Sequence, residues 1–239
     1  MQNQIMGHLV LGYPSLKASK EIALKYIAAG VKYLELQIPF SHPTADGPTI
    51  TNANIIAVGQ EKVSTQDCLD LIADLKKSHP SQEIVPMTYL NKVMGYGLER
   101  YCQFFSGLGI QNMIIPDLPF DALEAKIITD KGLELVPVIA PNISTIRLKA
   151  CLDLKPSLIY IMSDFKITGS AFGVNEKMTG LIQTIRAGTQ AEIGIGFGIN
   201  SAAEVKTVLE LADFAIVGSS LIVAEQEGRL VEKLLELVG

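Results

Sequence analysis

The sequence of 239 residues contains no tryptophan, and only 6% of its residues are aromatic. It also lacks any apolar run of the roughly 18 residues that a membrane-spanning helix requires. The first residues, MQNQIMGHLVLG, have neither the basic start and long apolar stretch nor the small-residue cleavage site of a secretory signal. These absences argue against a membrane protein, and we expect a cytoplasmic one.

An excess of basic residues is also missing. Lys and Arg together number 20 against 25 Asp and Glu, which gives a net charge of −5, and the basic residues are scattered along the chain. Without a basic face, binding to nucleic acid or to anionic lipid is not expected. The cysteines, Cys68, Cys102 and Cys151, are far apart and show no CxxC or Cys/His spacing, so we expect buried or half-buried free thiols and no metal site.

What the sequence does contain is a regular alternation of short apolar runs and longer helical patterns. The runs typical of strands are residues 7–12, 33–38, 83–88, 112–116, 133–139, 157–162, 192–196 and 214–218. Helical spacing is clearest in residues 16–30, 65–79 and 201–212. Such alternation predicts parallel strands joined by right-handed crossovers.

Eight units of this kind in one chain favour a TIM (β/α)8 barrel, a single α/β domain that covers residues 1–239. The alternative is an open, doubly wound sheet with a dinucleotide site. It is disfavoured because no GxGxxG motif opens a helix after a strand. In a TIM barrel the active site lies on the loops that follow the strands, so functional residues are expected at the ends of the eight apolar runs.

Glu35 is the most unusual residue at such a position, because it lies within the apolar run YLELQI (33–38). Alternation along a strand places Glu35 on one face with Tyr33 and Gln37, and the leucines and Ile38 on the other face, toward the helices. A carboxyl that points into a desolvated barrel interior can hold or donate a proton near neutral pH. Without such a role, it would be a structural glutamate paired with an Arg or Lys.

Asp46 follows in the loop after this strand, in the turn-like stretch TADGP. An aspartate before glycine is common in turns, where its side chain caps the local backbone. Because it lies on the loop that leaves the Glu35 strand, it is also a candidate second carboxylate.

Two glycine-rich strand ends are candidates for an anion site. GIGFGINSAAEV (194–205) runs from the seventh expected strand and IVGSSLIV (216–223) from the eighth, and they contain Gly198, Gly218 and Ser219. Small residues let backbone N–H groups approach an anion, and a helix N-terminus adds a positive dipole end. TIM barrels often bind phosphate at these loops. Glycines that only turn the chain and serines that only cap helices are the alternative.

The loop after the sixth expected strand, SDFKITGSAFG (163–173), is long enough to fold over a ligand as a lid and contains Gly169. Lys166 in this loop is either a phosphate contact or a solvated surface residue. Tyr160, near the end of the strand, is expected in the core, with a hydroxyl that could reach a ligand.

These segments together resemble the tryptophan synthase alpha subunit family. LELQIPFSHPTADGPTI (34–50) is similar to the family signature, in which a glutamate on a strand is followed by a loop that ends in Ala-Asp-Gly-Pro. The resemblance continues, with the same order and spacing, through LGYP (11–14), MTYLNKV (87–93), IIPDLP (114–119), ITGS (167–170), GFGI (196–199) and IVGSSLI (216–222).

The family cleaves indole-3-glycerol phosphate to indole and glyceraldehyde 3-phosphate, a retro-aldol reaction that requires protonation of indole C3. The resemblance assigns the proton transfers to Glu35 and the stabilisation of charge at the indole N–H to Asp46. It implies a phosphate site at Gly169, Gly198, Gly218 and Ser219. It also implies that the indole and glycerol space is lined, or its loops secured, by Phe197, Tyr89, Tyr160 and Thr168.

The resemblance further implies no cofactor in this chain, a beta subunit that carries pyridoxal phosphate, and an alpha2beta2 heterotetramer. The alternatives are a free-standing lyase that releases indole, and a weakly active subunit that mainly binds and activates the beta subunit. These alternatives remain open because several residues depart from the family pattern. The departures are Gln37 in place of Gly, His42 in place of Asp, Asp164 and Lys166 in the loop after the sixth strand, and His8 in place of a bulky apolar residue near the expected indole site.

Overall fold

The computed structural model describes residues 4–162, 176–196 and 198–239 of the chain. Its strands are β1 (Ile5–Val10), β2 (Tyr33–Gln37), β3 (Glu83–Met87), β4 (Asn112–Met113), β5 (Glu134–Leu135), β6 (Val138–Ile139), β7 (Leu158–Met162), β8 (Glu192–Gly196) and β9 (Phe214–Val217). Its helices are α1 (Leu16–Ala28), α2 (Pro48–Ile55), the π-helical turn η1 (Ile56–Gln60), α3 (Thr65–Ser78), α4 (Leu90–Tyr96), α5 (Leu98–Gly107), α6 (Leu123–Asp130), α7 (Thr145–Asp153), α8 (Glu176–Gly188), α9 (Ala202–Leu209), α10 (Ser219–Gln226) and α11 (Leu230–Val238).

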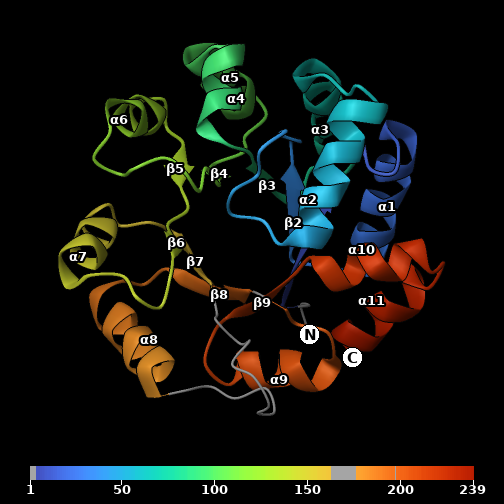
Figure 1. The fold of residues 1–239 in the computed structure, drawn as a ribbon. Coiled ribbons are helices and arrows are strands. Elements are labelled where there is room, and N and C mark those ends of the chain that lie inside the picture. Colours follow the sequence, from blue (N-terminus) through green and yellow to red (C-terminus); the bar gives the residue numbers. More distant parts are fainter. Residues whose placement is uncertain (1–3, 163–175, 197) are drawn as a thin grey trace.

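The strands form a curled parallel sheet that the helices surround (Figure 1). Seven strands have the order β3-β2-β1-β9-β8-β7-β6, and β4 pairs with β5. A parallel bridge between Met87 and Ile114 joins the end of β3 to the chain after β4, and β5 leads directly into β6. The strands therefore follow one another around a ring, and the predicted TIM barrel is confirmed.

Prolines explain the main differences from the predicted strands. The predicted strand at 133–139 is two short strands, β5 and β6, with Val136 and Pro137 between them. Because Pro137 has no N–H, it cannot donate to a neighbouring strand, and regular pairing stops there. The predicted strand at 112–116 is reduced to the two residues of β4 and the bridged residue Ile114, and the chain reaches Pro116 two residues later.

Each face of the sheet packs into its own apolar layer. Leu34 and Leu36 of β2, with Ile38 just after it, belong to the large layer between the strands and the helices, as the alternation predicts. Tyr33, on the opposite face, belongs to the smaller cluster inside the barrel, where its ring lies 4.9 Å from that of Phe214. This cluster extends from Met6 and Tyr33 near the starts of β1 and β2 to Met87 and Tyr89 at and beyond the end of β3.

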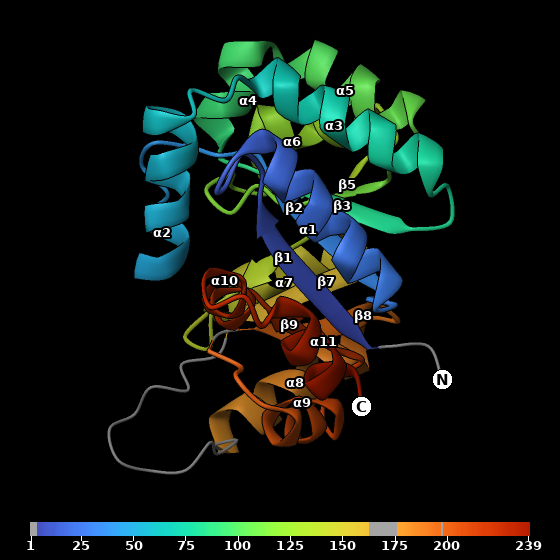
Figure 2. The same ribbon diagram turned by 90° about the vertical axis from the view of Figure 1, so that its right-hand side faces the viewer.

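Two helices lie at the end of the barrel where the strands finish. α2 and α10 are both found there and contact each other (Figure 2). α2 begins with Pro48, a residue that favours the first turn of a helix because its missing N–H has no helical partner there. α10 begins at Ser219, directly after β9 and Gly218. The loop after β2 and the end of β9 are thereby brought to one mouth of the barrel.

Cys68, Cys102 and Cys151 are free and buried in the structure, as predicted. Among the described residues, none of the helices combines the length and the apolar character needed to cross a membrane. In the same part of the chain, no three His, Cys, Asp or Glu side chains come together in a way that could hold a metal ion.

Candidate active site

Glu35 and His8 lie side by side in the barrel interior. β1 and β2 are parallel, and their register places His8 opposite Glu35. Both residues are almost fully buried: 4% of the surface of His8 and 3% of that of Glu35 is exposed. His8 Nδ1 lies 3.2 Å from Glu35 Oε2, an ion-pair distance, and Oε2 makes no aligned hydrogen bond in the described part of the chain. Glu35 thus points inward as predicted, but its ionisable neighbour is a histidine rather than an Arg or Lys.

Gln37 connects this pair to Asp46. The residue is fully buried, and its Nε2 donates to Asp46 Oδ2 at 2.6 Å. Its Oε1 accepts a hydrogen bond from Asn54 Nδ2 at 3.2 Å and lies 3.1 Å from His8 Nε2. The two acids predicted from the sequence therefore belong to one polar cluster, built by β1, β2, the loop after β2 and α2.

The loop that carries Asp46 is held at both sides. The Asp46 N–H donates to the backbone oxygen of Pro43 at 3.1 Å, so the turn predicted from the sequence is present. The hydroxyl of Tyr89, a residue with 1% exposure, accepts a hydrogen bond from the Ala45 N–H at 3.0 Å. Tyr89 therefore secures the loop from the neighbouring strand end, one of the two roles that the resemblance implies for it.

Burial and the neighbouring charges shift three pKa values in this cluster. Burial by itself lowers the pKa of His8, but the charge of the adjacent Glu35, together with that of Asp46 beyond Gln37, outweighs burial and raises this pKa above 6.5. Burial also raises the pKa of Asp46, against the opposing effect of His8. Burial, together with the two acids, raises the pKa of Tyr160 well above its ordinary value. Each of these three groups therefore releases its proton at a higher pH than it would in water.

The ends of β8 and β9 form the second part of the site. A Cβ atom at Gly218 would lie 3.3 Å from the Cβ of His8, so the backbone directly after β9 closely approaches the middle of β1. Ser220 Oγ donates to the backbone oxygen of Ile199 at 2.8 Å, which ties the start of α10 to the loop after β8. Gly198 in that loop has a φ of +77°, in the left-handed region that favours glycine. Two of the predicted phosphate loops are thus adjacent.

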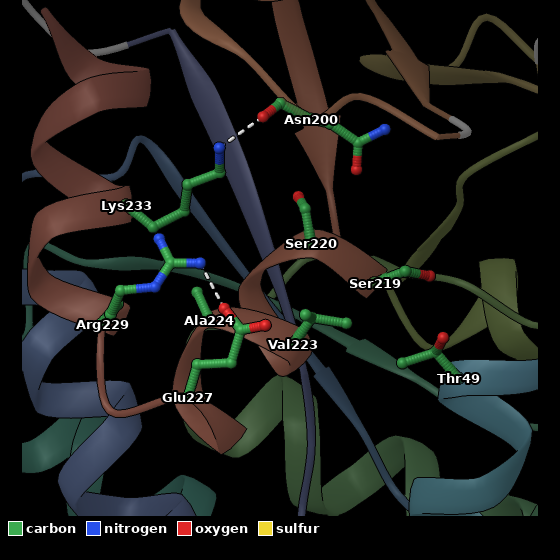
Figure 3. A pocket seen from close by; sticks show the side chains of 9 residues that line it. All are labelled: Thr49, Asn200, Ser219, Ser220, Val223, Ala224, Glu227, Arg229 and Lys233. Carbon is green, nitrogen blue, oxygen red and sulfur yellow. Dashed lines mark hydrogen bonds and ion pairs between the residues drawn. The ribbon is translucent and has the colours of Figure 1, made fainter.

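A hollow of about 340 Å³ opens beside the start of α10 (Figure 3). Its walls include Ser219, a predicted phosphate-binding residue, and two basic residues, Arg229 and Lys233. Both basic side chains already have partners, since Arg229 pairs with Glu227 and Lys233 donates to the backbone oxygen of Asn200. Among the described residues, both cations that line this hollow are therefore already engaged by other groups.

The sequence profile described as Tryptophan synthase alpha chain matches residues 1–236. The chain is 34% identical over 220 residues to the tryptophan synthase alpha chain of Desulfotalea psychrophila, an alignment that covers 91% of this chain and 86% of that one. It is 36% identical over 220 residues to the corresponding chain of Chloroflexus aggregans, with coverage of 91% and 82%. This chain belongs to the tryptophan synthase alpha chain family.

Solved structures agree with this family assignment. A structure of Mycobacterium tuberculosis tryptophan synthase matches 99% of this chain and 91% of its own, with a TM-score of 0.88 and 28% identity. A chain from Aquifex aeolicus VF5 matches 99% of this chain and 92% of its own, with a TM-score of 0.87 and 28% identity.

Membership of the tryptophan synthase alpha family places the chain in tryptophan biosynthesis, as the lyase that cleaves indole-3-glycerol phosphate. The alpha subunit has no cofactor of its own, and pyridoxal phosphate belongs to the beta subunit, the partner that the family implies.

The remaining predicted site residues are only partly described by the structure. Tyr160 is half-buried and packs against the cluster inside the barrel, and a Cβ atom at Gly196 would lie 2.8 Å from its hydroxyl. The tyrosine hydroxyl therefore lies at the end of β8, next to the candidate phosphate loops. The predicted site residues Thr168, Gly169 and Phe197, and the divergent Asp164 and Lys166, lie outside the described residues.

His8, Gln37 and Asn54 are the members of the cluster whose role sequence reasoning missed. His8 and Gln37 were identified only as departures from the family pattern, and Asn54 not at all. The one available signal was that Glu35 and Gln37 share a strand face. The contact of both with His8 depends on the register between β1 and β2, which alternation along a single strand does not specify.

Proposed function

We propose that Glu35 and Asp46 perform the cleavage of indole-3-glycerol phosphate into indole and glyceraldehyde 3-phosphate. The observation that carries this proposal is the position of Glu35, an acid with 3% exposure whose Oε2 has His8 Nδ1 as a neighbour at 3.2 Å. A buried acid beside a second titratable group is suited to general acid–base catalysis. Family membership identifies the reaction, and the polar cluster supplies the second acid.

In the proposed mechanism Glu35 first protonates indole C3 and then accepts the proton of the glycerol hydroxyl as the carbon–carbon bond breaks. Asp46 stabilises the positive charge that develops at the indole N–H. The phosphate would bind at Gly198, Gly218 and Ser219, together with Gly169. The substrate would be enclosed by side chains that include Tyr89, Tyr160, Thr168 and Phe197. The adjacency of the β8 and β9 ends and the start of α10 support this placement of the phosphate.

We also propose that the chain works in the cytoplasm within an alpha2beta2 heterotetramer, in which indole passes to the pyridoxal-phosphate site of the beta subunit. The exposed side chains of Ser41 and His42, with Ser41 Oγ 2.8 Å from His42 Nδ1, lie on the loop between Glu35 and Asp46 and are suited to contact a partner. A partner bound there would contact the loop that carries Asp46.

The deciding experiment incubates the purified chain with indole-3-glycerol phosphate and follows the release of glyceraldehyde 3-phosphate, with and without a beta subunit. We expect slow release by the chain alone and strong acceleration by the beta subunit. Absence of release under both conditions would contradict the proposed reaction for this chain.

The roles of the two acids are tested by substitution. Glu35→Gln should lower kcat by at least about 100-fold, because it removes the group that transfers protons. Asp46→Asn should cost less, since an amide keeps the polarity of the site although it loses the charge. The surface substitution Glu61→Gln is the matched control and should behave as wild type. Near-normal turnover by Glu35→Gln would show that another group carries the proton.

One observation favours the free-standing lyase as a second candidate. Asp46 is already held at 2.6 Å by Gln37 in the chain by itself, so the loop does not require a partner to place this acid. Rapid release of glyceraldehyde 3-phosphate that the beta subunit leaves unchanged would support this alternative.

A further inference from the structure

Which atoms of the polar cluster donate and which accept hydrogen bonds can be assigned step by step, starting from the backbone N–H of Phe40. The Phe40 N–H, which can only donate, lies 2.9 Å from Asn54 Oδ1. The other end of the Asn54 amide must then be its Nδ2, which donates to the backbone oxygen of Ile50 at 2.9 Å and to Gln37 Oε1 at 3.2 Å. Asn54 is therefore oriented by two backbone groups, independently of any ionisable side chain.

Asn54 in turn fixes the orientation of Gln37. Gln37 Oε1 accepts a hydrogen bond from Asn54, so the Nε2 group of Gln37 faces Asp46 Oδ2. A carboxylate can only accept, so the contact with Asp46 requires the same orientation of the Gln37 amide. His8 Nε2 lies 3.1 Å from Gln37 Oε1, so this ring nitrogen must carry a hydrogen.

A donor at His8 Nε2 constrains the other ring nitrogen. In the neutral ring with hydrogen on Nε2, Nδ1 is a bare acceptor, and here it lies 3.2 Å from Glu35 Oε2. With both groups deprotonated, a carboxylate oxygen and a bare ring nitrogen would lie 3.2 Å apart in a buried site with no proton between them, which is unfavourable. One proton must therefore reside on this pair, either on Nδ1 or on the carboxyl.

We propose that His8 is a positioning residue for the cleavage reaction: with Nε2 committed to Gln37, its Nδ1 shares one proton with Glu35 and keeps that acid supplied for donation. This inference rests on the proposed function of Glu35. When Glu35 gives its proton to indole C3, the carboxylate is left facing the bare Nδ1. The carboxylate beside a bare nitrogen readily accepts the proton of the glycerol hydroxyl. The pair of Glu35 and His8 therefore ends the reaction with the one proton that it had at the start.

The other ionisable groups around His8 do not replace this role. Tyr26 of α1 donates its hydroxyl to the backbone oxygen of His8 at 3.2 Å and does not contact the ring nitrogens in this way. Asp46 reaches His8 only through Gln37. Tyr160 of β7 faces the same two acids and holds its own proton.

The first test observes His8 without any assay of activity. The ring nitrogens of the full chain are followed by 15N NMR from pH 5 to pH 9, with the His8 signals assigned by their absence in His8→Asn. In the wild type we expect Nε2 to carry hydrogen throughout and Nδ1 to lose its proton only above pH 6.5. In Glu35→Gln the Nδ1 transition should move to lower pH by at least one unit. A neutral ring with hydrogen on Nδ1 and a bare Nε2, or a transition that Glu35→Gln does not move, would overturn the proposal.

The second test compares pH profiles of turnover. As pH rises the pair loses its shared proton, so kcat of the wild type should fall on the alkaline side. In His8→Asn, which keeps a polar group beside the carboxyl but cannot take up a proton, that alkaline limb should move to lower pH, with kcat at pH 8 reduced by tenfold or more and KM changed less. His79→Asn is the histidine control outside the site. An equal loss at every pH, with the limb unmoved, would mean that His8 acts only by packing.

The two tests also separate this inference from the proposed function. If the chain cleaves no indole-3-glycerol phosphate but His8 titrates as expected and responds to Glu35→Gln, the shared proton stands and the proposed reaction fails. If the chain is active and loses activity in Glu35→Gln, while the His8 titration is insensitive to Glu35, the reaction stands and the positioning role of His8 fails.

Discussion

At the scale of single residues, the burial of His8 and Glu35 determines the chemistry of the site. Removing two ionisable groups from water is unfavourable unless each gains a partner. Here the partners are arranged in a series, because Glu35 lies against His8, His8 against Gln37, and Gln37 against Asp46. A change at one member therefore alters the ionisation of the next, which is the physical basis for coupling between the two acids.

This series predicts a pH dependence of stability. The pKa of His8 is raised above 6.5 in the folded chain, so its protonation stabilises the fold fully below pH 6.5, and that contribution is lost as pH rises through the folded pKa. The excess of the wild-type unfolding free energy over that of His8→Asn should therefore be largest below pH 6.5. It should then decrease by at most about 1.4 kcal/mol per pH unit.

Urea unfolding at intervals from pH 5.5 to pH 8.5 measures this difference. His79→Asn is the control and should remain at a constant offset from the wild type. A difference between wild type and His8→Asn that grows with pH would contradict the direction of the shift.

At the scale of elements, caps determine where the helices around the barrel begin. Ser64 Oγ accepts from the Asp67 N–H at 3.1 Å, and Asp67 Oδ2 accepts from the Ser64 N–H at 2.9 Å, so α3 starts with a capping box. The Ser64 hydroxyl, which donates to Asp67 Oδ2 at 2.6 Å, and the Ser64 N–H together hold the pKa of Asp67 below its usual value. Ser201 and Glu204 form the same motif at the start of α9. Residues a few positions apart in the sequence thus set where these two helices begin.

Ser64→Ala should lower the free energy of unfolding by about 1 kcal/mol, because it removes the side-chain acceptor of the first turn of α3. Lys77→Ala, at an exposed position in the same helix, should change stability by less than about 0.5 kcal/mol. Chemical denaturation of both variants measures the effect. Equal stability of the two variants would show that the cap does not stabilise this helix in the whole protein.

At the scale of the whole molecule, closing the ring requires small and large side chains to alternate inside the barrel. Gly194 of β8 is paired in register with Phe214 of β9, and a Cβ atom at Gly194 would lie 2.1 Å from an atom of the Phe214 ring. The aromatic ring therefore occupies the space that a side chain on β8 would need. This packing belongs to the closed barrel, since the residues lie 20 positions apart in the sequence.

Gly194→Ala should destabilise the protein by about 1 to 3 kcal/mol, because the added methyl group would displace the ring of Phe214 from a packed interior. Gly180→Ala is the matched control in α8, where an added Cβ would meet none of the described atoms within 4 Å, apart from those of its own chain neighbours and helix backbone. That substitution should be neutral or stabilise the helix by about 0.5 to 1 kcal/mol. Urea unfolding should separate the two alanine variants, and a wild-type stability for Gly194→Ala would contradict this view of the interior.

The repeating pattern of the sequence predicted the barrel, the inward face of Glu35 and the turn at Asp46. These features depend on alternation within one strand or on residues a few positions apart, which are local properties of the chain. The same reasoning missed the break at Pro137. An apolar run indicates that a segment is a strand, but it does not show which residues of that strand pair with its neighbours. It also left open whether Glu35 had a basic partner.

The sequence by itself therefore determined the fold class, the two candidate acids and the family resemblance. Only the tertiary structure decided that His8 lies against Glu35 and that Gln37 joins this pair to Asp46. The reason is that β1 and β2 are separated by a helix, and a shift of one residue in their register would place His8 on the opposite face from Glu35. Packing of the whole barrel sets that register, and with it the position of the proton shared by the two side chains.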